Sequence, residues 1–359
     1  MPLNVTWQIT RIDRAGYSTW PSIAFSPSGQ LGIAYFSSIH GALRFATLNS
    51  GGTWDVETVD ASSGDCAPHL RYRFSQPAIS YAANQHDLKY ALRRGGTPLW
   101  TIDTIAQGGF GNALAFDAAH HPGISYNKKD DGLGYTGSQT PSVWVGSTVD
   151  AHGSGSFNSI AFGPSGRPAI AYHVPGGISW THQQLKYAAF DGAHWNTQTV
   201  GPGGGWCSLA FTPAGEPAVT YASDSGYNGS VMYAVLRSGS WQIETVASNA
   251  GTPSLAFTPA GAPAISYHDN VAAAVKYAVL VNGAWEHVLV EQSGKDQDGR
   301  LIGDFSFTSL AMSPGGQPAI SYYDDAHATI VCAIGRFGGR WGDRWRTILG
   351  SLLPFRTMR

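Results

Sequence analysis

The sequence predicts an all-β protein: a seven-bladed β-propeller of four-stranded antiparallel blades, in a single domain covering residues 1–359. The first reason is a repeat, because the segment 21–35 returns six more times. Each copy ends at a tyrosine, namely Tyr35, Tyr81, Tyr126, Tyr172, Tyr221, Tyr267 and Tyr322, with intervals of 46, 45, 46, 49, 46 and 55 residues. The second reason is that each copy holds four short β-rich runs separated by turn residues. Four strands in about 45 residues is the period of a propeller blade.

The strands follow one another in a fixed order within each repeat. A Ser-Leu-Ala-Phe strand leads through a tight Pro-x-Gly turn into a Pro-Ala-Ile-Ser-Tyr strand. A variable loop, a strand of the Leu-Lys-Tyr-Ala type and a short glycine turn come next, before a fourth strand that opens with tryptophan. The expected blades cover residues 15–59, 60–105, 106–149, 150–200, 201–246, 247–290 and 301–340.

Closure of the ring requires one further strand, because the seventh repeat needs a fourth. Residues 7–13 run directly into the first repeat, as the fourth strand of every other blade runs into its successor. The C-terminal segment 341–348 competes for the same place, but glycine and charged residues interrupt it. The sequence favours N-terminal closure, with strand 7–13 at the edge of the last blade.

Composition narrows the classes of partner. A formal net charge of −2 and 13% charged residues argue against nucleic acid and acidic membranes. The basic cluster at 336–346 is interrupted by glycines and is expected to be solvated. The chain start lacks the pattern of a signal peptide, and no apolar run reaches about 18 residues, so we expect a soluble protein in an unknown compartment.

No cofactor and no metal are expected. Cys66, Cys207 and Cys332 have neither CxxC spacing nor a motif shared with histidines. Two acidic pairs, Asp296 with Asp298 and Asp324 with Asp325, leave an adventitious calcium ion as the only exception.

The repeat resembles that of a bacterial propeller family whose blades read PAISYYD, LKYA and W…ETV. Residues 318–324 and 241–246 carry the resemblance, which extends over nearly the whole chain. The turn at 49–54 is distantly similar to the Asp-box turns of sialidase-type (BNR) propellers, but it lacks the aspartate, and no set of three arginines is evident. Such propellers serve as lectins, scaffolds and enzymes, so the resemblance implies the fold and leaves the function open.

Two kinds of loop are expected on the two faces of the disc. The turns after the first and third strands are short and uniform, and His120 and His121 belong to one of them. The loops on the other face vary in length and chemistry, which is typical of a binding surface on a rigid scaffold. The candidate ligand-binding residues are Trp20, His173, Trp180, Trp206, Asn228, His268 and Asp269. The tyrosines and tryptophans that recur in every blade are expected to pack between blades.

The first strand of each repeat gives the sharpest signal. Its small side chains recur two residues apart, as Ser22 and Ala24 do, and should surround the central channel, since side chains alternate along a strand. Only the second repeat replaces both, with His69 and Arg71. An imidazole with a pKa near neutrality can move protons, and a guanidinium can hold a carboxylate or phosphate. The alternative is that both side chains only fill the channel.

Two functions follow from these patterns. The first is a single-site binding protein for a small or saccharide ligand, possibly anionic, because the variable loops do not repeat as those of a multivalent lectin would. The second is a lyase-like enzyme acting by acid–base chemistry on an anionic saccharide, with His69, Arg71 and Tyr227 as the catalytic residues. A pure scaffold is the third interpretation.

Overall fold

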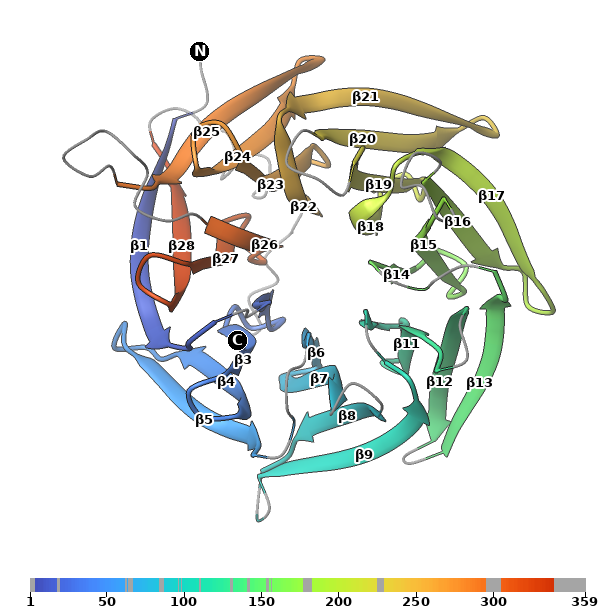
Figure 1. Ribbon diagram of the computed structural model, residues 1–359, viewed down its shortest axis with the longest axis horizontal. Helices are drawn as coiled ribbons and strands as arrows, with labels where there is room; N and C mark the ends of the chain where they lie inside the picture. Colours follow the sequence, from blue (N-terminus) through green and yellow to red (C-terminus); the bar gives the residue numbers. More distant parts are fainter. Residues whose placement is uncertain are drawn as a thin grey trace, which may run out of the picture.

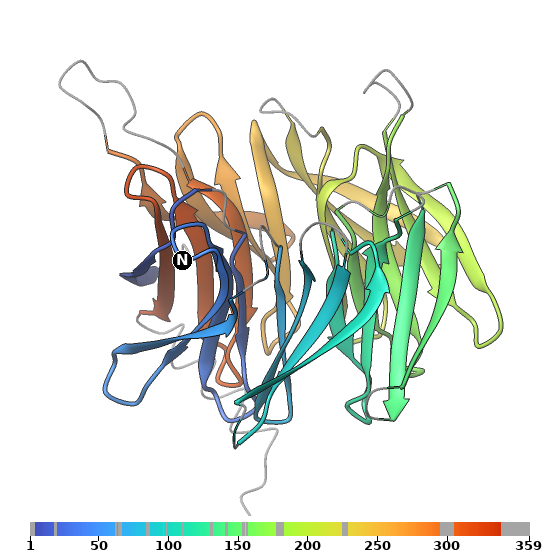
Figure 2. The same cartoon turned by 60° about the horizontal axis from the view of Figure 1, so that its bottom comes forward.

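The computed structural model describes residues 4–338, apart from positions 18–19, 62, 64–66, 84–86, 96, 98, 110, 130–131, 141–142, 153–154, 156, 177–182, 225–228 and 295–304. Its strands form seven four-stranded antiparallel sheets arranged as blades around a central axis (Figure 1). The prediction of an all-β, seven-bladed propeller is confirmed. In the tilted view, the strands run from one face of the disc to the other (Figure 2).

Apart from β6, the innermost strands carry small side chains toward the axis, where the seven strands converge. In chain order they are β2 (Ser22–Phe25), β6 (His69–Arg73), β10 (Ala113–Phe116), β14 (Ser159–Phe162), β18 (Gly205–Phe211), β22 (Ala250–Phe257) and β26 (Phe305–Met312). Between the small residues lie isoleucine and leucine side chains, such as Ile23 and Leu70, which are buried between neighbouring blades. This alternation is what an inner strand needs, because one of its faces meets the channel and the other a packed sheet.

The two middle strands of each blade form most of the core. The second strands are β3 (Leu31–Ser37), β7 (Gln76–Ala83), β11 (Pro122–Asn127), β15 (Pro168–Val174), β19 (Pro217–Ala222), β23 (Pro263–Asp269) and β27 (Pro318–Asp324). The third strands are β4 (Ala42–Leu48), β8 (Asp87–Arg93), β12 (Leu133–Thr140), β16 (Gln184–Phe190), β20 (Ser230–Arg237), β24 (Ala274–Val281) and β28 (Thr329–Phe337). Both sheet faces of these strands are covered by adjacent blades, so they read as nearly continuous apolar runs.

The outer strands connect each blade to the preceding one through their leading tryptophans. They are β5 (Trp54–Asp60), β9 (Trp100–Gln107), β13 (Val143–Asp150), β17 (Trp195–Pro202), β21 (Ser240–Ser248), β25 (Ala284–Gln292) and β1 (Val5–Arg14). Six of these tryptophans meet an aromatic ring on the third strand of the preceding blade edge to face, with centroids 5.2–5.5 Å apart. Such pairs add about 0.5–1.5 kcal/mol beyond the burial of area. The recurring tryptophans therefore hold blades together.

The recurring tyrosines of the second strands have the same role. Their rings are buried, and several donate a hydrogen bond to a carboxylate at the end of the preceding blade's outer strand. Tyr81 reaches Asp60 at 2.7 Å and Tyr172 reaches Asp150 at 2.8 Å. These residues are therefore structural and are not a stacking surface for sugars.

The N-terminal strand β1 completes the last blade. It pairs along its length with β28, and the sheet order is β1-β28-β27-β26. Trp7 occupies the place of the leading tryptophan, with its ring 5.5 Å from that of Tyr277 in the preceding blade. Arg11 bridges Asp324 of the last blade and Glu291 of the sixth, each at 2.9 Å. The ring is thus closed by pairing the first strand of the chain with the last described strand.

No helix in the part of the chain that the structure describes is long and apolar enough to cross a membrane.

Candidate functional site

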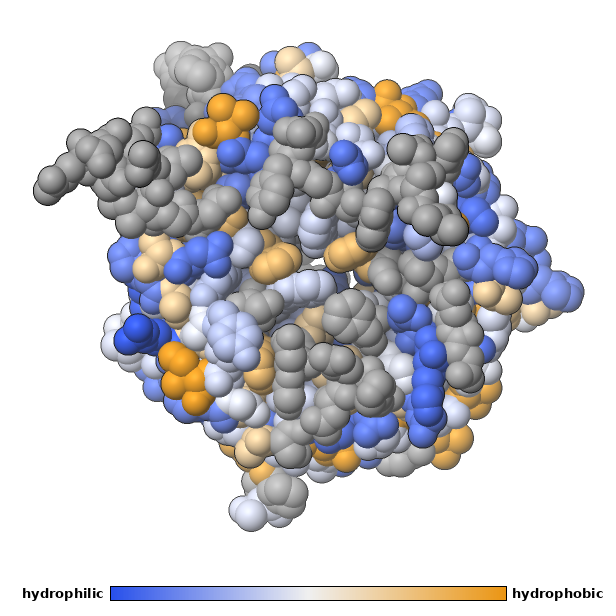
Figure 3. All heavy atoms as spheres, in the orientation of Figure 1, coloured by the Kyte–Doolittle hydropathy of each residue, from blue (hydrophilic) through white to orange (hydrophobic). Residues whose placement is uncertain are grey.

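A cavity of about 300 Å³ lies on the axis of the ring, where residues from all seven blades meet. In the orientation of Figure 1, the disc is hollowed at its centre, with apolar side chains around the hollow (Figure 3). The lining can be described as three levels that follow the inner strands down from the face with the variable loops. The mouth level consists of Trp20, Ala67, Gly111, Phe157, Trp206, Thr252 and Phe307. The hydroxyl level, two residues further along each strand, consists of Ser22, His69, Ser159, Ser208, Ser254 and Ser309. The deep level, two residues further again, is lined by Arg71 and Ala210.

Aromatic rings dominate the mouth level. The ring of Trp20 lies 5.0 Å from that of Phe307 and 6.4 Å from that of Phe157, between centroids. Phe157 also lies 4.9 Å from Trp206. The Nε1 atom of Trp206 is buried and donates to no group among the described residues. The mouth therefore offers flat apolar surfaces and one available N–H donor.

The mouth residues are held in an uncommon backbone conformation. Phe157, Trp206, Thr252 and Phe307 have φ values of 48°, 47°, 46° and 57°. Bulky or β-branched residues rarely adopt this left-handed region, which costs of the order of 1–3 kcal/mol for each residue. Strain of this kind persists only where the surrounding structure enforces it, and it is concentrated at functional sites.

Side chains of the next blade bind mouth-level carbonyl groups, including those of Phe157 and Thr252. Thr308 donates its hydroxyl to the carbonyl oxygen of Thr252 at 2.7 Å, and Cys207 donates its thiol to that of Phe157 at 2.9 Å. Asn112 donates its amide to the carbonyl oxygen of Ala67 at 2.9 Å. Burial raises the pKa of Cys207 to about 12, so this thiol is an inert structural donor.

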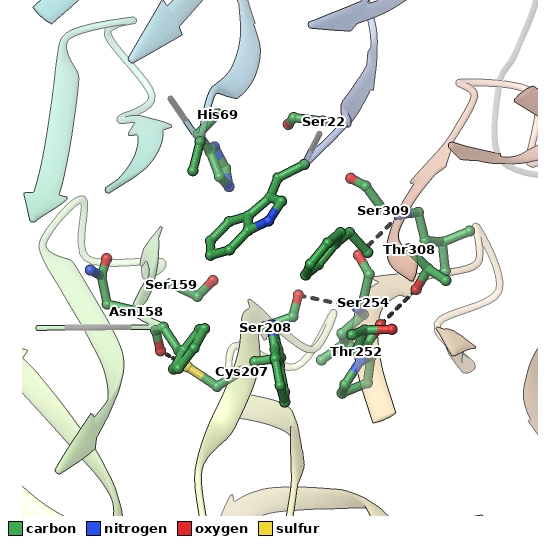
Figure 4. A pocket seen from close by; sticks show the side chains of 18 of the residues that line it. Ser22, His69, Asn158, Ser159, Cys207, Ser208, Thr252, Ser254, Thr308 and Ser309 are labelled. Atoms are coloured by element: carbon green, nitrogen blue, oxygen red, sulfur yellow. Dashed lines mark hydrogen bonds between the residues drawn. The ribbon is translucent and has the colours of Figure 1, made fainter. Parts of the chain in front are cut away.

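The side chains of the hydroxyl level surround the cavity (Figure 4), and hydrogen bonds to them connect neighbouring blades. Each serine Oγ accepts the backbone N–H of the following blade's inner strand, as Ser159 does from Leu209 at 3.0 Å. The equivalent bonds join Ser22 to Leu70, Ser208 to Leu255, Ser254 to Leu310 and Ser309 to Ile23, at 3.0–3.3 Å. With Oγ accepting from the backbone, each hydroxyl retains a hydrogen that it can donate into the cavity.

His69 takes the place of a serine in this ring. Its Nδ1 accepts the backbone N–H of Leu114 at 3.2 Å, so the neutral ring carries its proton on Nε2. Burial and the charge of Arg71 hold the pKa of His69 well below its ordinary value. The expectation of a pKa near neutrality is therefore wrong: at neutral pH this imidazole is a hydrogen-bond donor in the cavity, and it has no free nitrogen lone pair with which to take a proton.

Arg71 supplies the positive charge of the cavity. Its Nη1 donates to the carbonyl oxygen of Leu70 at 2.8 Å, and it forms no ion pair with any carboxylate in the described part of the chain. Burial lowers the pKa of Arg71 to about 10, which leaves the guanidinium charged at neutral pH. A half-buried charge without a counter-ion among the described residues is partly desolvated, and an anion entering the cavity would offset that cost.

The other residues predicted as ligand contacts lie elsewhere or outside the described residues. His173 and His268 are each 4% exposed; the first packs behind Phe157, with ring centroids 6.2 Å apart, and the second bonds to Asn270. Asp269 pairs with Lys276 at 2.6 Å and binds two backbone N–H groups of its own turn. None of these three lines the cavity. Trp180, Tyr227 and Asn228 fall outside the described residues.

Sequence reasoning missed Phe157 and Phe307 of the mouth level. A signal in the sequence could have found them: each lies two positions before a serine of the hydroxyl level, as Trp20 and Trp206 do. Over the described ranges, no three histidine, cysteine, aspartate or glutamate side chains come together in a way that could hold a metal ion.

The comparisons with known proteins identify the architecture and no family. The chain matches no family model, and no curated protein matches its sequence. A protein of unknown function from Dyadobacter fermentans has a similar structure, with a TM-score of 0.59 and 13% identity over 93% of this chain and 99% of that one. The polysaccharide lyase Uly1 gives a TM-score of 0.55 at 8% identity, covering 93% and 99% of the two chains. The six-bladed fucose lectin of Aleuria aurantia gives 0.53 at 11% identity, covering 78% and 97%. Identities this low establish a shared fold alone.

Proposed function

We propose that this protein binds one small saccharide that carries a carboxylate, in the cavity on the axis of the propeller. The observation that carries the proposal is Arg71, a cation without a carboxylate partner among the described residues, in a cavity whose upper walls are aromatic rings and hydroxyl groups. The volume of about 300 Å³ is at the lower end of the range of ligand sites.

The three levels of the cavity match the three chemical features of an acidic sugar. Arg71 can hold the carboxylate through charge-assisted hydrogen bonds. The serine hydroxyls and the Nε2–H of His69 can donate to sugar oxygens. The rings of Trp20, Phe157, Trp206 and Phe307 can cover the apolar face of a pyranose ring, and Trp206 Nε1 can donate at its edge.

Binding is favoured over catalysis by the hydrogen bond at His69. A lyase needs a base, and Nδ1 of this imidazole is already an acceptor for Leu114 while Nε2 carries the proton. Similar structures include a fucose lectin and a polysaccharide lyase, so the architecture is compatible with both kinds of carbohydrate chemistry. Lyase activity is therefore the second candidate function, and the experiment distinguishes it from binding alone.

The test compares sugars that differ only in the acid group. Galacturonic acid against galactose, and glucuronic acid against glucose, are titrated into the protein by calorimetry. We expect the acids to bind and the neutral sugars to bind at least about tenfold more weakly, because a hydrogen-bonded ion pair contributes about 1.5–3 kcal/mol. Arg71→Ala should remove the preference for the acid.

Arg73→Ala is the matched control, because Arg73 lies on the same strand but outside the cavity, with its Nε donating to the carbonyl oxygen of His120. It should leave the affinity unchanged. Equal affinity for the acid and neutral sugars, or no effect of Arg71→Ala, would contradict the proposal. Release of an unsaturated product from a polyuronate, lost in His69→Ser, would establish the lyase instead.

A further inference from the structure

We infer that the cavity admits its ligand end first, so that the protein recognises a terminal acidic residue of a saccharide and not the interior of a chain. This inference rests on the proposed function and adds which part of a saccharide is bound.

The closed ring is the first argument. Every blade is a complete four-stranded sheet, and β1 pairs with β28 to finish the last one. The walls of the cavity are therefore continuous around the axis, with residues from all seven blades at the mouth level. A chain cannot enter such a cavity sideways, as it can enter an open groove, and must bring one of its ends to the axis.

The depth of Arg71 is the second argument. The deep level lies four residues below the mouth level along the inner strands, which is about 13 Å at 3.3 Å per residue. A carboxylate that enters from the face with the variable loops passes the aromatic mouth and the hydroxyl level before it approaches Arg71. Acidic groups that remain on the face of the disc do not approach the guanidinium.

Trp20 narrows the entrance. It belongs to the first blade, yet its indole lies beside Phe307 of the seventh blade and 6.4 Å from Phe157 of the fourth. The first and fourth blades stand across the ring from each other, so this side chain reaches over the mouth toward its far side.

The chemistry of a uronate chain completes the argument. In a 1,4-linked polyuronate, the carbon that bears the carboxylate is bonded to the linkage carbon C4, and only the ring oxygen separates it from the other linkage carbon, C1. An interior residue would have to carry a neighbour on each side of its carboxylate past Trp20. A terminal residue carries one neighbour, which can remain at the mouth among the aromatic rings.

The experiment counts proteins bound per chain. Galacturonic acid and 1,4-linked oligogalacturonates of increasing length are titrated into the full-length protein by calorimetry. We expect the number of proteins bound per chain to be the same at every length, one for each kind of end that is recognised, with a Kd per end close to that of the monomer. A number of bound proteins that grows with chain length would overturn the inference.

A pair of trisaccharides separates this inference from the proposed function. Both contain one galacturonate and two galactose residues, with the acid either at an end or in the middle. We expect binding with the acid at one end and a loss of at least about tenfold with the acid in the middle, as for removal of a charged hydrogen-bonded contact. Equal binding of both trisaccharides would overturn the inference while leaving Arg71-dependent binding of the monomer intact. Failure of the monomer to bind in an Arg71-dependent way would overturn both.

Discussion

The imidazole of His69 occupies the place that a serine holds in five other blades, and its protonation follows from that substitution. As the serines do, it accepts a backbone N–H from the next blade. Unlike them, it can be protonated, and protonation of Nδ1 would break that bond beside the charge of Arg71. Nδ1 of His69 therefore bonds two blades together, while the Nε2–H is left to donate into the cavity. One side chain contributes both to the closed propeller and to the proposed site.

The pH dependence of stability should report this arrangement. The unfolded chain has an ordinary histidine pKa near 6.5, and the folded protein holds the pKa of His69 well below it. Below about pH 6.5 the unfolded state therefore binds a proton at His69 that the folded state does not bind. The free energy of unfolding falls as the pH falls. His69→Ser keeps an acceptor for Leu114 and should reduce the slope by up to about 1.4 kcal/mol per pH unit.

Urea unfolding between pH 7 and 4.5 measures this slope. His173 and His287, whose pKa values burial also lowers, are present in both proteins, so their contribution cancels in the comparison. The same slope in both proteins would show that His69 is protonated in the folded state.

Ala113 is the one position of the hydroxyl-level register that carries no acceptor. The backbone N–H of Ile160, equivalent to that of Leu209, has a buried methyl group at the place where Leu209 finds Ser159. Ala113→Ser supplies the missing Oγ at a position where five blades already accommodate it. We expect the free energy of unfolding to rise by about 1 kcal/mol.

Ser208→Ala is the converse substitution, since it removes the acceptor for Leu255. It should lower the free energy of unfolding by about 1–3 kcal/mol, because a buried N–H loses its partner. Both variants are compared by urea unfolding. A destabilised Ala113→Ser protein would mean that the third blade has no room for the hydroxyl.

At the scale of the element, the sequence predicted which side chains of the inner strands face the channel. Strict alternation in β6 placed His69 and Arg71 on the side facing the cavity, and both line it. Alternation is reliable here because a one-residue slip would turn every buried isoleucine and leucine toward the channel.

The mouth of the cavity could not be predicted in the same way. In β18, β22 and β26 the pairing shifts register just before the serine of the hydroxyl level. The residue at that shift has a positive φ. Gly is the usual signal for such a conformation, whereas here Trp206, Thr252 and Phe307 adopt it. At Thr252 the carbonyl group is bound by Thr308 of the next blade, 56 residues away, so no local pattern reveals the conformation there.

The ends of the second strands misled the sequence reasoning for a related cause. His173 and His268 follow the recurring tyrosine and were expected in exposed loops. The strands continue through them and both are buried; Phe157 packs against His173, and His268 pairs in the sheet with Gly251 of the inner strand. A polar residue at the end of a strand does not by itself reveal whether a neighbouring strand covers its side chain.

At the scale of the whole molecule, stability depends on the contact between β1 and β28. Deleting residues 1–14 removes the outer strand of the last blade, the Trp7 contact with Tyr277 and the Arg11 bridges. Loss of a fully buried tryptophan costs about 3–5 kcal/mol; Trp7 is partly buried, but a whole strand is lost with it, so we expect the Tm to fall by about 10 °C. A protein lacking only residues 1–3, which precede β1, is the matched control. Equal melting of the two truncated proteins would show that β1 contributes nothing to closure.

The same pairing has a consequence for how the chain folds during synthesis. β1 leaves the ribosome before the other described strands, but its partner β28 follows more than 300 residues later. Until then β1 has no neighbour on its hydrogen-bonding edge, and loop-closure entropy opposes the final pairing more than any other in the chain. Blades one to six can each form from contiguous sequence as they emerge. The seventh blade can form only when β26, β27 and β28 have been made and can pair with β1. Closure is therefore the last step, and the waiting edge of β1 is the part of the nascent chain most exposed to mispairing with another copy.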